Sequence, residues 1–170
     1  IKQVIEVLKS NFLTTGPRVR EFEECFADYV NAKNAVAVCN GTSALDLAVN
    51  VLNLPKGSEI ITTPFTFVAS SNCILFNQCK PVFADIKEDT YNIDPARIKE
   101  KITNKTKAII YVDYAGQPCD IDEIKEIAEK NNLFLIEDAS HALGAEYKGT
   151  KVGCMADLTT FSFHPVKHIT

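Results

Sequence analysis

Four polar side chains in the last third of the sequence could do chemistry together: Asp138, His141, Ser162 and Lys167. The first two follow an apolar run, 133–136, that has the composition of a buried strand, and the others lie in or after a second strand-like run, 159–163. In an open α/β sheet, polar groups just beyond the carboxyl ends of parallel strands face the ligand crevice. An acid, an imidazole, a hydroxyl and an amine are the groups needed to hold an electron-poor pyridine ring and to form an imine with it.

The elements that must position these groups alternate along the chain. Hydrophobic patterns predict strands at 35–38, 59–63, 81–85, 107–112, 133–137 and 159–163. They predict helices at 2–11, 18–30, 44–52, 96–102 and 121–131, and one that ends near 75. Tyr147–Lys151 is expected to form a hairpin-like turn before the last strand. The alternation predicts an α/β fold with a mostly parallel sheet and helices on both faces.

A Gly-Thr-Ser turn, residues 41–43, follows the first expected strand and begins a helix. Free N–H groups and the helix dipole make such a turn a natural cradle for a phosphate, and the hydroxyls can donate to it. The alternative is ordinary N-capping by Thr42 or Ser43, which serves only the helix.

Two motifs together carry a family resemblance. The run Glu-Asp-Ala-Ser-His-Ala-Leu-Gly (137–144), followed by Phe-Ser-Phe-His-Pro-Val-Lys-His-Ile-Thr (161–170), resembles the nucleotide-sugar aminotransferases of the DegT/DnrJ type. These are enzymes of fold type I that depend on pyridoxal phosphate (PLP). The resemblance covers nearly the whole chain and implies the large-domain fold of that class.

The resemblance implies roles for the residues already named. Lys167 would form the imine with PLP, Asp138 would pair with the pyridine nitrogen, and His141 would lie near the cofactor. Thr42, Ser43 and Ser162 would hold the PLP phosphate. Each has a plainer interpretation: Lys167 as a surface lysine, Asp138 as a helix cap and His141 as a core histidine bonded to backbone.

Three more site residues come from the resemblance. An aromatic side chain after Pro64 would stack on the cofactor ring, and Phe67 is the candidate, with Phe65 in competition. Thr15, in a Thr-Thr-Gly-Pro turn, and His164 would contact substrate. Thr15 could instead belong to a plain turn, Phe67 could be a core residue, and His164 could support the site rather than contact substrate.

The resemblance also implies a substrate. The Val-Asp-Tyr-Ala-Gly run, 112–116, is similar to the subgroup that acts in pseudaminic acid synthesis, so the expected substrate is a nucleotide-linked 4-keto-6-deoxy sugar, UDP-linked, with glutamate as amino donor. Transaminases that form aminoarabinose or other 4-amino sugars are the alternative. A non-catalytic PLP-binding or nucleotide-binding relative is a different class, although the sequence lacks G-x-G-x-x-G after its first expected strand.

Composition sets the remaining expectations. The net charge of −4 gives no reason to expect nucleic acid or an anionic membrane as a partner, and no apolar run is long enough for a span. Six cysteines without a C-x-x-C pair, and few histidines, predict no metal site and reduced, mostly buried thiols in a cytoplasmic protein. Residues 1–170 are expected to be the N-terminal part of a PLP-binding large domain whose small C-terminal domain lies outside this chain. The full-length protein is expected to be a homodimer.

Overall fold

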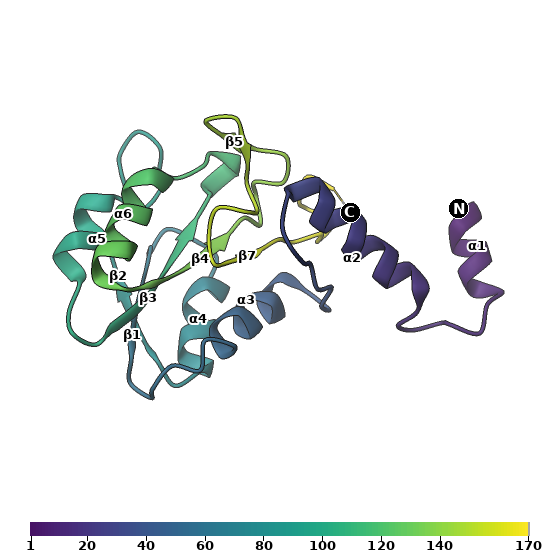
Figure 1. Cartoon of the computed structure of the whole chain (residues 1–170), viewed down its shortest axis with the longest axis horizontal. Coiled ribbons are helices and arrows are strands. Elements are labelled where there is room, and N and C mark those ends of the chain that lie inside the picture. The colour runs from purple at the N-terminus through teal and green to yellow at the C-terminus, as the bar shows by residue number, and fades with distance from the viewer. Residues whose placement is uncertain (170) are drawn as a thin grey trace. The chain divides into compact units, whose positions relative to one another are not determined.

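The computed structural model describes residues 1–169, which fall into two compact units, Ile1–Ala37 and a larger unit that begins at Val38 (Figure 1). The first unit holds helices α1 (Lys2–Leu8) and α2 (Pro17–Val30). Pro17 occupies the first turn of α2, where a missing N–H costs nothing, and Asn31 ends the helix in the left-handed conformation.

Both helices form where the hydrophobic pattern predicts them, but neither has a well-buried apolar face. Helix α1 has no buried residue, and α2 buries only Ala27 and Val30, while Phe22 and Tyr29 stay exposed. Their apolar side chains stay exposed because two helices of a 37-residue unit offer too little surface to cover one another.

The strand expected at 35–38 does not form. The backbone N–H of Ala37 donates to the Glu23 carboxylate of α2 at 2.8 Å instead of joining a ladder, and Val36 is 72% exposed. An apolar, β-branched run becomes a strand only when another strand accepts its hydrogen bonds.

The second unit is built on a five-stranded, entirely parallel sheet in the order β2-β1-β3-β4-β7. Its strands are β1 (Glu59–Thr62), β2 (Lys80–Phe83), β3 (Thr106–Val112), β4 (Phe134–Asp138) and β7 (Leu158–Thr160). The central strands β1 and β3 are almost wholly buried. After β2 the chain returns to the other side of β1, so the strand order reverses between β1 and β3, where such sheets bind ligands.

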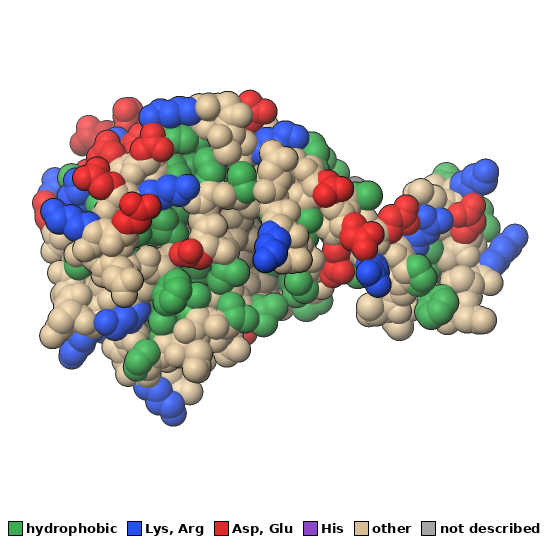
Figure 2. Space-filling model, in the orientation of Figure 1, with side chains coloured by type: hydrophobic (Ala, Val, Ile, Leu, Met, Phe, Trp, Pro, Cys, Tyr) green, Lys and Arg blue, Asp and Glu red, His purple; other side chains and the backbone are tan. Residues whose placement is uncertain are grey.

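Helices cover both faces of this sheet, as predicted (Figure 1). Helices α3 (Gly41–Asn50) and α4 (Ala69–Phe76) pack on one face, in a core with Ile60, Ile110 and Ile136. Helices α5 (Pro95–Lys101) and α6 (Ile121–Asn131) pack on the other, around Ile109 and Tyr111. The face seen in Figure 2 carries acidic and basic side chains interspersed over α5 and α6.

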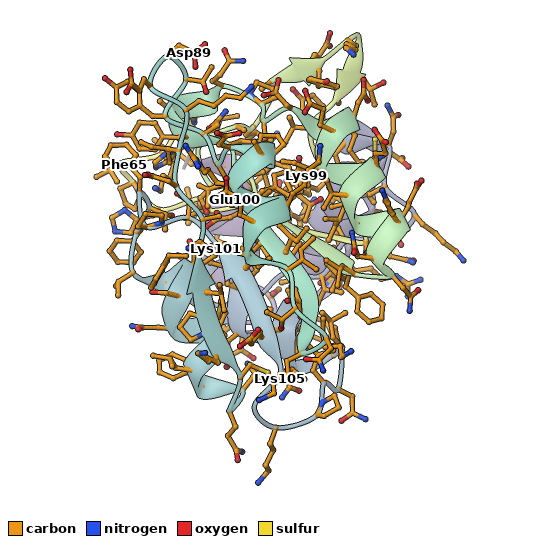
Figure 3. All side chains as sticks on the ribbon, turned by 90° about the vertical axis from the view of Figure 1, so that its left-hand side faces the viewer. Phe65, Asp89, Lys99, Glu100, Lys101 and Lys105 are labelled. Carbon is orange, nitrogen blue, oxygen red and sulfur yellow. The ribbon has the colours of Figure 1, made fainter. Side chains whose placement is uncertain are left out.

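The carboxyl ends of the strands meet at one edge. Figure 3 shows Phe65 and Asp89, which follow β1 and β2, toward one end of the sheet, and Lys105, which precedes β3, at the other. The short 3-10 helix η1 (Tyr114–Gly116) follows β3 at the first of these ends. The hairpin of β5 (Glu146–Tyr147) and β6 (Thr150–Lys151) forms as expected.

Strand β7 is shorter than predicted. It ends at Thr160, so Ser162 lies past the strand end rather than on a strand that runs to residue 163. Residues 161–169 instead run on in turns, with the Lys167 N–H donating to the His164 carbonyl at 2.8 Å. Lys167 therefore lies at the end of a turn, flanked by the exposed residues Val166 and Ile169.

Candidate active site

Asp138 is the last residue of β4, paired in register with Val112 of β3, and its side chain is buried. Its Oδ2 accepts a hydrogen bond from the Ser70 hydroxyl at 2.9 Å, and its Oδ1 accepts one from the Ser140 N–H at 3.2 Å. Ser70 in turn contacts the Thr66 hydroxyl at 2.9 Å. Both carboxylate oxygens are thus held, which fixes the orientation of the acid beyond the strand end.

Lys167 reaches back to the loop after β4. Its Nζ lies 2.7 Å from Nε2 of His141, although the two residues belong to different segments at the carboxyl edge. The 139–141 segment is not a helix, so His141 reaches the site through turns rather than by sharing a helical face with Asp138. An amine and an imidazole in contact form a pair between which a proton can pass.

The surroundings of His141 favour its neutral form. Burial lowers the pKa of its imidazole, the positive charge of Lys167 lowers it further, and Asp138 acts in the opposite direction. The Ala115 N–H points to Nδ1 at 3.4 Å, and the Tyr114 ring meets the imidazole edge-on, with centroids 6.1 Å apart. The tautomer follows the charge of Lys167: opposite its ammonium, Nε2 accepts and the imidazole proton lies on Nδ1, whereas opposite a neutral amine Nε2 can donate and Nδ1 accepts from Ala115.

The start of α3 is the turn that is predicted to hold a phosphate. Asn40, rather than Thr42 or Ser43, caps the helix, its side chain accepting from the Ser43 N–H at 2.8 Å. Within the described residues, the N–H groups of Gly41 and Thr42 have no hydrogen-bond acceptor. A Cβ at position 41 would lie 3.2 Å from Cβ of Ser162, so glycine lets that hydroxyl approach the helix end.

The two aromatic candidates lie in different surroundings. Phe65 packs against Tyr114 and Tyr91, with ring centroids 4.7 and 5.5 Å apart. Phe67 is 72% exposed, which removes the interpretation that it is a core residue. Its ring face is therefore available to a ligand, whereas the ring of Phe65 is already used in packing.

The remaining predicted residues are Thr15 and His164. Thr15 lies in an exposed bend of the first unit. His164 is exposed, and its Nδ1 accepts from the Val166 N–H at 3.4 Å. Sequence patterns alone did not identify Ser70, Tyr114 and Ala115 as site residues. For Ser70 a signal existed, because a serine in the largely apolar segment 69–76 indicates that its hydroxyl has a buried partner.

No group of His, Cys, Asp and Glu in the described part of the chain could hold a metal ion, and none of its helices is long and apolar enough to cross a membrane. All six cysteines are free thiols. Only three of the six are buried, although most were expected to be. Cys25 and Cys39 are exposed, and Cys154 is half-buried.

Taken together, the residues fit a phosphorylated aromatic aldehyde. Gly41 and Thr42 offer unpaired N–H groups beside the Ser162 hydroxyl, and a side chain at position 41 would fill that space. Asp138 offers an oriented buried carboxylate and Lys167 an amine. A parallel α/β sheet with these groups at its carboxyl edge fits the class of PLP-dependent transferases.

The chain belongs to the DegT/DnrJ/EryC1/StrS aminotransferase family, which it matches over residues 1–170. Enzymes of this family use PLP.

Similar proteins include the protein MJ1066 of Methanocaldococcus jannaschii, 49% identical over the whole chain and 44% of the relative. Another is a UDP-4-amino-4,6-dideoxy-N-acetyl-β-L-altrosamine transaminase of Campylobacter jejuni, 46% identical over the whole chain and 46% of the relative. The solved structure of PseC from Helicobacter pylori, an aminotransferase in the biosynthesis of pseudaminic acid, superposes with a TM-score of 0.94 at 41% identity over 99% of this chain and 46% of PseC. The chain thus spans just under half the length of each of these proteins.

Proposed function

We propose that the full-length protein is a PLP-dependent aminotransferase that transfers an amino group to the carbonyl carbon of a nucleotide-linked 4-keto-6-deoxy sugar. The observation that carries this proposal is the contact of 2.7 Å between Lys167 Nζ and His141 Nε2 beside the buried, doubly hydrogen-bonded Asp138. The family membership supports the reaction class.

The residues that would hold the cofactor come from three places at the carboxyl edge. Thr42, Ser43 and Ser162 would bind its phosphate at the start of α3. Asp138 would pair with the pyridine nitrogen, Phe67 would cover one ring face, and Lys167 would bind it covalently. When bound, PLP supplies an electron sink for the charge that develops on the reacting carbon.

The side chains themselves orient and move protons. Ser70 and the Ser140 N–H keep the Asp138 carboxylate pointed in one direction. His141, as a neutral imidazole, can accept a proton from the Lys167 ammonium at Nε2 and so free the lone pair of the amine to attack a carbonyl carbon. Lys167 can then carry a proton to and from the reacting carbon.

The finer assignment is a UDP-linked sugar of the pseudaminic acid route, with glutamate as amino donor and Thr15 and His164 at the substrate. It is supported by the transaminase activity of the Campylobacter relative and by the role of Helicobacter PseC in the biosynthesis of pseudaminic acid. We further propose that residues 1–170 are the N-terminal part of the large domain and that the whole protein is a homodimer. Free thiols at all six cysteines support a reducing compartment, the cytoplasm.

The first test is chemical. The full-length protein is incubated with PLP, reduced with borohydride and digested, and its peptides are analysed by mass spectrometry. A pyridoxyl mass on Lys167 is expected. The variant Lys167→Ala should lose the adduct, whereas Lys130→Arg, at an exposed lysine of α6, should keep it. An adduct on another lysine, or none, contradicts the proposed site.

The second test concerns the substrate. Glutamate is supplied with UDP-linked or GDP-linked 4-keto-6-deoxy sugars, and 2-oxoglutarate and amino sugar are measured. Formation of both products with the UDP-linked sugar supports the finer assignment, and turnover of the GDP-linked sugar alone overturns it. A protein that gives the Lys167 adduct but transfers no amino group to any sugar would be a non-catalytic PLP-binding relative.

A further inference from the structure

Two acidic side chains, Asp113 and Glu137, are completely buried at the carboxyl ends of β3 and β4. Glu137 directly precedes Asp138, and the Asp113 N–H donates to the Asp138 carbonyl at 3.2 Å. None of the ion pairs formed by the described residues includes either acid. Two buried carboxylates without a counter-ion would be very costly, so something must remove one of the charges.

Each of the two acids has one carboxylate oxygen that lacks a hydrogen-bond donor. Asp113 Oδ1 accepts from the Cys119 N–H at 3.0 Å, and Glu137 Oε2 accepts from the Thr159 hydroxyl at 2.8 Å and the Gly153 N–H at 3.2 Å. The second oxygen of each acid has no hydrogen-bond partner among the described residues. Two carboxylates only accept and cannot bond to one another, but a single proton turns one of them into a donor.

The electrostatics identify the protonated partner. Burial raises the pKa of Asp113 to about 8, and the charge of Glu137 contributes in the same direction. Burial also raises the pKa of Glu137, but its contacts with Thr159 and Asp113 lower it. Burial and then the Glu137 charge raise the pKa of Tyr111, whose buried hydroxyl interacts with Glu137 without a hydrogen bond of ordinary length. Glu137 accepts two hydrogen bonds and Asp113 only one, so the negative charge is better held on Glu137, and Asp113 is the acid that keeps a proton at neutral pH.

Asp113 is linked to His141 through one short loop. Its bond to Cys119 closes the loop 113–119, which contains η1. That loop supplies the Ala115 N–H to His141, and Gly116 packs so closely on His141 that an added Cβ would lie 2.9 Å from its carbonyl oxygen. A change in the charge of Asp113 would move the same loop that orients the imidazole.

We propose that Asp113 and Glu137 share one proton, with Asp113 as the neutral donor, and that Asp113 acts as a positioning residue that holds His141 against Lys167. Glu137, Tyr111 and Cys119 are the titratable groups that face Asp113. Lys167, Asp138 and His168 are those that face His141. The shared proton does not depend on the proposed function. Only the role of His141 at the site rests on the proposed function.

Infrared spectroscopy of the full-length protein tests the proton. The C=O stretching band of a buried carboxylic acid is expected at about pH 7. Asp113→Asn should lose it, because the amide replaces the acid and donates to Glu137 in its place. Glu137→Gln should lose it too, because its amide donates to an ionised Asp113. The control Asp89→Asn, in an exposed loop that Figure 3 labels, should keep it.

The absence of this band from the wild-type protein would overturn the shared proton. The contradiction would be most direct if, in addition, potassium ions raised the unfolding temperature of the wild type but not that of Asp113→Asn. That pair of results would mean two ionised carboxylates neutralised by a bound cation. A band that survives both Asp113→Asn and Glu137→Gln would place the neutral acid elsewhere.

Proton NMR of His141 tests the positioning role without any measurement of activity. The ring signal, assigned with a His141→Gln variant, should show a second inflection at about pH 8, where Asp113 loses its proton. Asp113→Asn should abolish this inflection and leave the main titration of His141 unchanged. A wild-type curve without the second inflection, alongside a normal infrared band, would overturn the positioning role while leaving the shared proton intact. Failure of the Lys167 adduct test would leave both readouts interpretable.

Discussion

Lys167 Nζ and His141 Nε2 lie 2.7 Å apart, and this contact joins the turns after β7 to the loop after β4. It pairs an amine with an imidazole whose pKa is lowered by burial and by the lysine charge. Protonation of His141 would therefore place two cations in contact in a half-buried site.

This relationship predicts an acid limit to the chemistry of Lys167. As the pH falls through the lowered pKa of His141, the imidazole gains a proton and can no longer keep Nδ1 as an acceptor for Ala115. The rate of PLP adduct formation, followed by absorbance, should fall along with the stability of the protein. His141→Asn should lower this rate by about tenfold or more at neutral pH. A variant with the wild-type rate and pH profile would show that the imidazole is not involved.

Ser70 should be needed to keep Asp138 in place. Ser70→Ala removes the donor to a buried carboxylate oxygen and should lower the free energy of unfolding by about 1–3 kcal/mol, together with PLP affinity. Chemical denaturation and PLP titration measure the two effects. Ser71→Ala is the matched control, because the Ser71 hydroxyl bonds only to the Val68 carbonyl of its own segment. Equal effects of the two variants would mean that the helix, rather than the carboxylate, depends on Ser70.

Glycine at position 41 should be required for phosphate binding. In Gly41→Ala the new Cβ would meet Ser162 at 3.2 Å, so PLP affinity should fall by about tenfold, as expected when overpacking costs about 1–3 kcal/mol. Stability should change little, because alanine is the better helix former. The double variant Gly41→Ala with Ser162→Gly restores the space but removes the hydroxyl. Tighter PLP binding by this double variant than by Gly41→Ala would separate the effect of space from that of the hydroxyl. Unchanged PLP binding by Gly41→Ala itself would contradict a phosphate site at the start of α3.

The two phenylalanines should respond differently to truncation. Phe67→Ala should weaken PLP binding with little loss of stability, because the side chain is 72% exposed. Phe65→Ala should mainly lower stability, because it removes ring contacts with Tyr114 and Tyr91. Thermal unfolding without PLP, combined with PLP titration, distinguishes the two. The reverse pattern would make Phe65 the stacking residue.

Much of the sheet could be predicted because its central strands are continuous apolar runs and its helices have clear periodicity. The prediction was wrong at 35–38 and at the end of β7, where strand formation depends on whether a partner accepts the backbone hydrogen bonds. Sequence patterns could not show which residue hydrogen-bonds to Asp138. Ser70 lies in another element, far from Asp138 in the sequence, so no local pattern links the two. Likewise, the burial of Asp113 depends on the packing of β3 between two other strands.

The hydrogen bond between Ser70 and Asp138 joins residues separated by 68 positions in the sequence. Contacts of this kind form late, since a long loop must close and parallel strands must pair before they can exist. The acid that we assign to the cofactor should thus become ordered only near the end of folding, when β1, β3 and β4 lie side by side. A ligand that recognises the completed site binds the native state alone. Raising the ligand concentration should therefore increase the free energy of unfolding.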